Sequence, residues 1–447
     1  MKYQTGDPPM GICLIASHVR KNTDAEVSVL DTTFNPSMDY VKSLLDKEKP
    51  DMVGIYTDTL MCNDACEVAK EAKKKGCFVF FGGPHPTVMP NSVKPYADLI
   101  VLGEGENTVC SVVENFPERN FEDIPGIIFR KKDSWKKNPV EKYISDLDSL
   151  EYPALEMVDM NKYLGLWHIL DGIDPNIKGT NIIASRGCPY NCSFCQPNLK
   201  ALFGNHTRHR SPEHVVGELR DLKKKFGIQA FFLQDDTFNI DSEWVRKFCE
   251  LLKKEKLGLL WACNVRVNTI KDIEEVKMMH SAGLRHVHIG VESGSQRILN
   301  QIYRKGIKLE DVSKAIDNLN EVGVTSLCFF MLGAPGETKE EIKQTINFAV
   351  SLNATEITAS ITTPLPGTKL WDMMKDKYKL SKDFSKFDYY SERAFEDPNI
   401  SYKELKRYQK WLLFRFYTHP KRWRYIMKHL TSLKGMKKMW LKVKRFI

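Results

Sequence analysis

The sequence predicts an α/β protein with three parts: an N-terminal open sheet, a partial barrel of six strand–helix units, and a helical C-terminal region. Three observations predict this. Short apolar runs alternate with Lys/Glu/Ala-rich segments in the first 150 residues, the alternation restarts at Thr180 with more units, and residues 380–447 are basic and aromatic. We expect a domain at 1–120, a connector at 121–178, the barrel at 179–378 and the helical region at 379–447.

The N-terminal part carries four apolar runs of strand length. They are Glu26–Leu30, Met52–Tyr56, Cys77–Phe81 and Asp98–Leu102, separated by helical segments such as Cys66–Lys75. Strands that alternate with helices form parallel sheets covered by the helices. Residues 119–178 are rich in Pro, Asp and Asn, which predicts an irregular connector.

The barrel part carries six strand signals. They are Asn181–Ser185, Gln229–Gln234, Leu259–Cys263, Arg285–Val291, Val324–Leu332 and Glu356–Ile361, with helices such as Glu213–Lys225 and Lys339–Leu352 between them. Six units in about 200 residues favour an open (β/α)6 barrel over a closed barrel of eight.

The composition is that of a globular protein, with 42% hydrophobic and 28% charged residues among 447. No apolar run is long enough to span a bilayer, and no basic-then-apolar leader begins the chain. Eleven cysteines are spread over the whole length, which is typical of a reducing compartment and not of a disulfide framework. We therefore expect a cytoplasmic protein.

Three cysteines have a spacing that predicts a metal cluster. Cys188, Cys192 and Cys195 form C-x3-C-x2-C directly after a predicted strand. Three thiolates on one loop can hold a [4Fe–4S] cluster and leave its fourth iron open to a chelating substrate. The alternatives are a zinc site, which prefers four ligands in paired C-x2-C units, and chance clustering.

At these residues the chain resembles the radical S-adenosylmethionine (SAM) superfamily. In that superfamily the open iron chelates SAM, and one electron splits SAM into methionine and a 5′-deoxyadenosyl radical. The resemblance implies that Phe194 packs beside the adenine. Further matches end successive predicted strands, at Asp235–Phe238, Asn264–Arg266, Gly290–Ser295, Leu332–Thr338 and Thr363–Thr368, and Arg208–Glu213 matches the entry to the first barrel helix.

These strand ends supply the residues that we expect to bind SAM. Glu292 and Ser293 suit its ribose hydroxyls and ammonium group, and Arg266 suits its carboxylate. Asp236 is a further candidate, and Gly333 begins a turn that lets the backbone approach the nucleoside. Each could instead be an ordinary polar residue at a strand end.

The N-terminal part resembles the Rossmann-like, cobalamin-binding half of B12-dependent radical SAM enzymes, a group that includes hopanoid methylases and Mg-protoporphyrin ester oxidative cyclases. The matching segments are Pro8–Gly11, Val53–Thr57, Phe81–Thr87 and Leu102–Glu106. The resemblance implies a cofactor channel at the carboxyl edge of the sheet. Its expected cobalamin contacts are Thr57, Thr59, Gly82, Gly83, Glu104 and Gly105, with His85 shaping the pocket wall.

Two departures from that pattern matter. The usual Asp-x-His-x-x-Gly, whose His ligates cobalt, is replaced by Asp31–Pro36, which has no histidine, so we expect cobalamin to bind without that ligand. The segment before Pro8 is also too short and polar for the usual first strand, so this strand is missing or lies upstream. The alternative is a vestigial domain, or one adapted to hold substrate.

The C-terminal residues 401–447 contain fifteen Lys/Arg and one acidic residue, Glu404, interleaved with aromatic side chains. Three interpretations stay open: a helical cap on the barrel with a solvated basic side, contact with an anionic membrane surface, or binding to nucleic acid. Nucleic acid is the least expected. Relatives that act on lipophilic substrates have similar long helical tails. This similarity favours a lipophilic small molecule as the substrate and peripheral attachment of the protein at the inner face of the membrane.

The resemblance implies a methyltransferase that uses methylcobalamin and a 5′-deoxyadenosyl radical to methylate an unactivated carbon. The alternative is a radical oxidative cyclase or carbon–carbon coupling enzyme without methyl transfer. A tRNA methylthiotransferase is less expected because the N-terminal cysteines do not form a second cluster set, and so is a nonenzymatic binder. A reducing partner of the flavodoxin or ferredoxin type would supply electrons.

Overall fold

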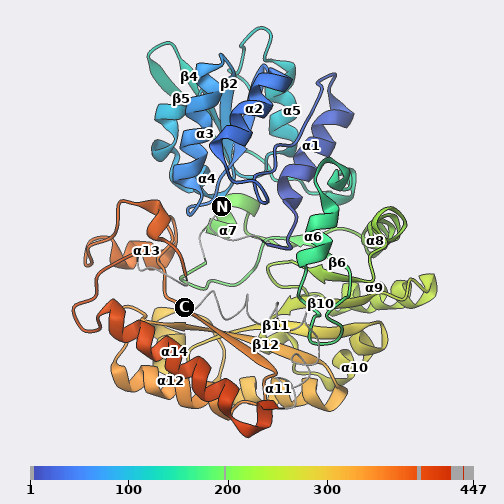
Figure 1. Ribbon diagram of the computed structural model, residues 1–447, viewed down its shortest axis with the longest axis vertical. Coiled ribbons are helices and arrows are strands. Elements are labelled where there is room, and N and C mark those ends of the chain that lie inside the picture. The colour runs from blue at the N-terminus through green and yellow to red at the C-terminus, as the bar shows by residue number, and fades with distance from the viewer. Residues whose placement is uncertain (1–4, 196–197, 390–393, 424–435, 437–447) are drawn as a thin grey trace.

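The computed structural model describes residues 5–195, 198–389, 394–423 and 436. The chain forms two lobes (Figure 1). The N-terminal lobe is a sheet flanked by helices, and the second lobe is a larger sheet with helices on its outer side and helix α14 (Tyr402–Thr418) along it. The connecting segment and helix α6 (Met160–Leu166) run between the lobes.

The N-terminal sheet has five strands in the order β1-β2-β3-β4-β5, with β1–β3 parallel and β4–β5 added as an antiparallel hairpin. The strands are β1 Met52–Tyr56, β2 Phe78–Gly82, β3 Leu99–Val101, β4 Ile127–Lys131 and β5 Ser134–Asn138, and the helices are α1 Met10–Asn22, α2 Met38–Glu48, α3 Cys62–Lys74 and α5 Glu106–Glu114. Successive side chains of β2 enter two different clusters, Val79 with α2 and α3, and Phe78 with α1 and α5. The sheet is therefore covered on both faces.

Three of the four expected N-terminal strands are confirmed, and the fourth is wrong. Residues 24–32 form no strand pairing. Leu30 packs into the apolar cluster beneath α2 and α3, and Val27 into the one beneath α1 and α5, so these side chains are buried although their backbone joins no sheet. The expectation of an irregular connector is also wrong in part, because β4, β5 and α6 lie within residues 119–178. The proposed domain boundaries stay predictions.

The second sheet confirms all six expected barrel strands. They are β6 Gly179–Ile182, β9 Ala230–Leu233, β10 Leu260–Val265, β11 Leu284–Glu292, β12 Thr325–Leu332 and β13 Glu356–Ile361. All neighbours are parallel, in the order β13-β12-β11-β10-β9-β6. Within the described residues no strand joins β6 to β13, so the barrel is open. The largest apolar core lies between this sheet and helices α8 Pro212–Phe226, α9 Ser242–Glu255, α10 Ile273–Ser281, α11 Leu309–Val322 and α12 Lys339–Ser351.

Local capping chemistry explains where the barrel helices begin. Ser211 caps α8 by accepting a hydrogen bond from the His214 amide, with Pro212 at the first helical position. Thr338 and Glu341 form a capping box at the start of α12. Both caps follow strand ends closely, which fixes the loops on the C-terminal side of the sheet.

The C-terminal region is helical only in part. The described residues of this region before Ser401, 380–389 and 394–400, contain a short 3-10 turn, Phe384–Lys386, and a bridge between Leu380 and Phe395 but no α-helix, so the expected helix is wrong for them. The helix expected further on is confirmed as α14, which ends before Pro420. The rest of the basic region, 424–435 and 437–447, lies outside the described residues.

Helix α14 closes the free edge of β13. It buries Leu405, Gln409, Leu412 and Phe416 against the barrel. The Gln409 side chain donates to the Ala359 carbonyl at 2.7 Å, and the Tyr417 hydroxyl donates to the Ile357 carbonyl at 2.9 Å. Two carbonyl groups of β13 that would be unpaired at the edge of the sheet therefore accept hydrogen bonds from α14. No helix of the described chain combines the length and apolar character that crossing a bilayer requires.

Candidate active site

The cysteine loop lies between β7 (Ser185–Arg186) and α7 (Asn198–Phe203), at the C-terminal end of the barrel. The Cys192 thiol is buried, and it accepts a hydrogen bond from Arg266 Nη1 at 3.3 Å. Cys188 Sγ lies 3.8 Å from the Thr237 hydroxyl. In the described residues, no three His, Cys, Asp or Glu side chains form a preformed metal site. The loop offers three thiols beside a cation, which is the donor chemistry of an iron–sulfur cluster.

The middle of the loop is held by backbone bonds from two connections that follow barrel strands. The Ser193 amide donates to the Tyr303 carbonyl at 2.9 Å, and the Ser193 carbonyl accepts from the Leu370 amide at 2.8 Å. Tyr303 is fully buried, with its hydroxyl 2.6 Å from that of Thr362. The loop is therefore fixed to the connections that follow β11 and β13.

Arg266 and Lys305 form a buried cationic layer behind the cysteines. The Arg266 guanidinium lies 3.7 Å from the centre of the Tyr190 ring, and it donates to the Lys305 carbonyl. Lys305 Nζ lies 2.8 Å from Glu292 Oε1, and both side chains are 8% exposed. The Lys305–Glu292 pair offers one cation and one carboxylate at a buried site, which are the partners that the carboxylate and the ammonium group of an amino acid require.

Lys305 is a site residue that sequence reasoning missed. It follows a π-helical turn, Ile298–Ile302, and not a strand end. π-Turns concentrate at functional sites, so a recognised turn could have given a signal. Glu292, which was predicted, has a left-handed backbone with φ 71°, a strained conformation for a glutamate. A Cβ on Gly290 would lie 2.4 Å from Glu292 Oε1 and 2.5 Å from Lys305 Nζ, so a side chain at this position would displace the ion pair.

The other expected SAM residues divide into two groups. The Phe194 ring lies 5.5 Å from that of Tyr303 and 5.7 Å from Lys305 Nζ. Asp236 accepts a hydrogen bond from the backbone of Gly187, next to Cys188, and burial raises the pKa of Asp236 to about 6. Both therefore lie with the cysteine loop. Ser293 is bonded elsewhere, its hydroxyl 3.1 Å from that of Thr345 on α12.

Gly333 lies in a turn that is packed beneath α14. Its amide donates to Glu337 Oε2 at 2.6 Å, its φ is 81°, and a Cβ there would lie 2.4 Å from Leu405 of α14. Burial raises the pKa of Glu337 to about 8. The element that closely approaches Gly333 in the structure is therefore helix α14 of the same chain.

The expected cobalamin contacts at the ends of β1 and β2 lie together. Thr57 is fully buried, and its hydroxyl has no hydrogen-bond partner in the described structure. Gly83 has φ 104°, and a Cβ there would lie 2.8 Å from the Thr57 carbonyl. His85 is fully buried, 3.1 Å from the Thr59 hydroxyl and 2.9 Å from that of Ser92, which supports a pocket-wall role. An orphaned hydroxyl beside a side chain-free Gly82–Gly83 turn fits a flat cofactor with a polar tail.

Glu104 and Gly105 have other surroundings. Glu104 forms ion pairs with Arg186 and Arg208, and a Cβ on Gly105 would lie 3.2 Å from Ile15 of α1. The segment Asp31–Pro36, which has no histidine, is held by α6, because the Tyr163 hydroxyl donates to Asp31 Oδ2 at 2.7 Å. Glu104 therefore connects the N-terminal lobe to the barrel.

The two groups of site residues face the same region. Helix α4 (Pro84–Val88) follows the Gly82–Gly83 turn and packs against α7, which follows Cys195. A Cβ on Gly367, at the end of β13, would touch both Val88 of α4 and Asn198 of α7. The carboxyl edges of the two sheets therefore meet at the cysteine loop.

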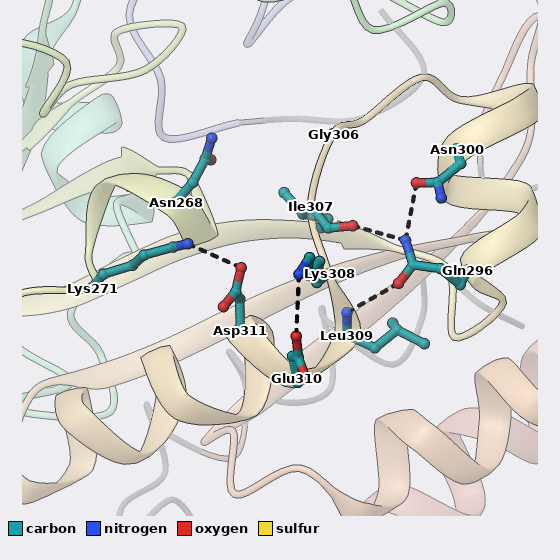
Figure 2. Close-up of a pocket in the computed structure, with 10 residues that line it drawn as sticks. All are labelled: Asn268, Lys271, Gln296, Asn300, Gly306, Ile307, Lys308, Leu309, Glu310 and Asp311. Carbon is teal, nitrogen blue, oxygen red and sulfur yellow. Dashed lines mark hydrogen bonds and ion pairs between the residues drawn. The ribbon is translucent and has the colours of Figure 1, made fainter.

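An open pocket of about 730 Å³ lies outside this region (Figure 2). Most of the residues that line it have polar or charged side chains, and Lys271 and Asp311 pair at 3.0 Å, as do Lys308 and Glu310 at 3.6 Å. It contains no residue predicted to bind a cofactor. Gly306 on its rim directly follows Lys305, so the pocket borders the cationic layer from outside.

Comparison with known proteins agrees with both halves of this arrangement. Residues 182–349 match the profile of the Radical SAM superfamily, and residues 5–113 match that of the B12 binding domain. The chain is 33% identical over 377 residues to an uncharacterized methyltransferase of Pyrococcus horikoshii, covering 82% of this chain and 78% of the relative. It is 30% identical over 402 residues to an anaerobic magnesium-protoporphyrin IX monomethyl ester cyclase of Rubrivivax gelatinosus, covering 86% and 69%.

Two solved structures share the fold. One is the cobalamin-dependent S-adenosylmethionine radical enzyme OxsB with aqua-cobalamin and S-adenosylmethionine bound, at 17% identity and a TM-score of 0.77, covering 99% of this chain and 70% of that one. The other is the radical S-adenosylmethionine methyltransferase TsrM from Kitasatospora setae with cobalamin and a [4Fe–4S] cluster bound, at 20% identity and a TM-score of 0.67, covering 81% and 74%.

Proposed function

The chain belongs to the radical SAM superfamily and carries a B12 binding domain, and from this premise we propose that it is a cobalamin-dependent methyltransferase. The reaction is the transfer of a methyl group to an unactivated carbon of a lipophilic small molecule. One observation carries the proposal: the carboxyl edges of the two sheets meet at the cysteine loop through α4 and α7. A methyl carrier and a radical source must reach the same substrate, so their sites have to adjoin.

Cys188, Cys192 and Cys195 would hold the cluster, and Arg266 would balance its charge from beside Cys192. Lys305 and Glu292 would bind the carboxylate and amino groups of SAM, with Phe194 beside the adenine. When bound, the cluster supplies the electron that cleaves SAM, and cobalamin supplies a carrier for the methyl group. The buried setting of these side chains excludes water from the charged groups.

The cobalamin part of the proposal rests on the ends of β1 and β2. Thr57 would donate its orphaned hydroxyl to the cofactor, and Gly82 and Gly83 would leave room for it. His85 is engaged on both ring nitrogens, so it would line the pocket and not ligate cobalt.

The alternative is an oxidative cyclase, favoured by the similarity to the Rubrivivax enzyme. The relative with the higher identity carries the name methyltransferase. The two reactions differ in their SAM products. Methyl transfer forms both S-adenosylhomocysteine and 5′-deoxyadenosine, whereas cyclisation forms 5′-deoxyadenosine alone.

The exposed side of α14 supports a lipophilic substrate reached at a membrane surface. Trp411 and Phe414 are 42% and 67% exposed, and Arg407 and Lys410 lie on the same side. An exposed aromatic pair among cations suits the interface of an anionic bilayer. The other interpretation, a helical cap with a solvated basic side, explains the cations but not the exposed aromatic rings.

The proposal is tested by anaerobic reconstitution with iron, sulfide and cobalamin, using reduced flavodoxin or ferredoxin as the electron donor. We expect about four irons per chain, as a [4Fe–4S] cluster requires, one cobalt, and both SAM products. Thr57→Val should lower cobalt and leave iron unchanged. Bound iron without cobalt would remove the cobalamin assignment and favour the cyclase.

A further inference from the structure

Four buried charges connect the two lobes. Glu104 and Glu106 follow β3, whereas Arg186 and Arg208 lie on β7 and β8 (Arg208–His209). Arg186 binds Glu104 at 2.7 Å and Glu106 at 2.5 Å, and Arg208 binds Glu104 at 3.0 Å. No side chain of the four is more than 14% exposed. The N-terminal lobe thus supplies both anions and the barrel both cations.

The Glu104 carboxylate is fully engaged at the centre of this cluster. Besides both arginines it accepts a hydrogen bond from the Ile144 amide at 2.8 Å. Arg208 donates in addition to the Phe203 carbonyl at 2.8 Å. Desolvation offsets most of the attraction in a buried ion pair, so such clusters add little stability, but breaking one leaves an unpaired buried charge. These four charges can therefore hold the two lobes in one fixed relative position.

On the barrel side the cluster acts on the start of the cysteine loop. Arg186 and Arg208 lie opposite each other in the β7–β8 pair. Gly187 alone separates Arg186 from Cys188, with φ 84° and the His206 carbonyl 2.7 Å from where a Cβ would be. One constrained residue therefore carries the position of Arg186 to the first cysteine.

On the other side the cluster reaches the expected cobalamin edge. The Gly103 amide, next to Glu104, donates to the Thr87 hydroxyl at 3.2 Å. Thr87 donates in turn to the Gly83 carbonyl at 2.8 Å. A continuous path of bonds thus runs from the Gly82–Gly83 turn through Glu104 to Cys188.

We propose that Glu104 is a positioning residue, which fixes the cysteine loop against the carboxyl edge of the N-terminal sheet. On the proposed function, this sets the distance between the cluster and cobalamin. The residue was expected to contact cobalamin itself, whereas its oxygens face arginines and a backbone amide. Its action is on the geometry of the two sites and not on the reacting atoms.

The test compares Glu104→Gln with Glu122→Gln in the full chain. Glu122 is a matched control because it also binds two cations, Lys131 and Lys136, in the same lobe but with a side chain 33% exposed. Hydrogen exchange is measured on iron-loaded protein, over peptides that cover residues 185–195. In cobalamin-loaded protein, pulsed dipolar EPR measures the distance distribution between the reduced cluster and Co(II).

For Glu104→Gln we expect hydrogen exchange in the cysteine loop to rise at least about tenfold. A change of this size corresponds to only a part of the free energy that is lost when a buried ion pair is broken. The iron and cobalt contents should equal those of the wild type, and the distance distribution should broaden. Glu122→Gln should change neither. Unchanged exchange and an unchanged distribution, or equal changes in the control, would overturn the proposal. If the wild type bound no cobalamin, the proposed function would fail, and the exchange measurement would still decide the role of Glu104.

Discussion

Lys305 Nζ and Glu292 Oε1 lie 2.8 Å apart, although the two residues are thirteen positions apart in sequence, and each residue is less than a tenth exposed. Glu292 is the last residue of β11, and its backbone is left-handed, with φ 71°, although it is not a glycine. Strain of this kind persists where the surrounding structure enforces it, and it concentrates at functional sites. The pair therefore identifies the part of the cationic layer that a charged ligand would use.

Lys305→Met should weaken SAM binding at least about tenfold, because it removes the cation and leaves Glu292 unpaired in a buried site. Equilibrium binding of SAM to iron-loaded protein under anaerobic conditions measures the effect. Lys308→Met is the control, since its side chain is 74% exposed. Equal affinities of the Lys305 variant and the wild type would exclude this pair from the SAM site.

Cys188→Ala should lose bound iron and 5′-deoxyadenosine formation, because the thiol is one of the three expected cluster ligands. It should retain cobalamin, because the expected cobalamin contacts lie in the N-terminal lobe and Cys188 lies in the barrel. Metal analysis and product chromatography measure this. Cys249→Ala, which changes a buried thiol on α9, should keep both cofactors. Retention of iron by the Cys188 variant would contradict the cluster assignment.

Glu337→Gln should flatten the dependence of stability on pH. Burial raises the pKa of Glu337 from 4.5 to about 8, so the folded protein keeps this proton while the unfolded chain loses it. Its contribution to the free energy of unfolding is complete below pH 4.5 and falls as the pH rises to about 8, by up to ~1.4 kcal/mol per pH unit. Denaturant unfolding at several pH values measures the difference between the variant and the wild type. Parallel curves would mean that Glu337 does not titrate in this range.

Gly333→Ala should destabilise the protein by about 2–4 kcal/mol, since it combines a strained φ with overpacking against Leu405. Adding Leu405→Ala should remove the part of this destabilisation that is due to the steric clash, but not the part that is due to the strained backbone. Urea unfolding of the two single variants and the double variant forms a cycle that separates them. Strict additivity would show that the glycine and the helix do not interact.

Trp411→Ser combined with Phe414→Ser should weaken binding to anionic vesicles at least about tenfold, because burying one such ring is worth about 1.5–3 kcal/mol. Co-sedimentation with phosphatidylcholine vesicles, with and without phosphatidylglycerol, measures this at low salt. Binding of the wild type should require the anionic lipid. Failure of the wild type to bind would leave α14 as a cap on the barrel.

The sequence was most informative where one local pattern determines the structure. Each barrel strand is a short apolar run, and the spacing of Cys188, Cys192 and Cys195 defines a single loop. The hairpin β4–β5 was missed because three of its five described β5 residues are polar or charged and exposed. The roles of Glu104 and Lys305 were missed for another reason. Their partners are distant in sequence, and only the packing of the two lobes brings the charges together.

The bonds from Gln409 and Tyr417 to β13 have a consequence for the solution behaviour of the protein. An uncovered strand edge of this kind recruits matching strands from other molecules and leads to polymerisation. A chain shortened before Tyr402 would present the Ile357 and Ala359 carbonyls to such partners. We therefore expect that removal of helix α14 would promote self-association of the protein through the edge of β13.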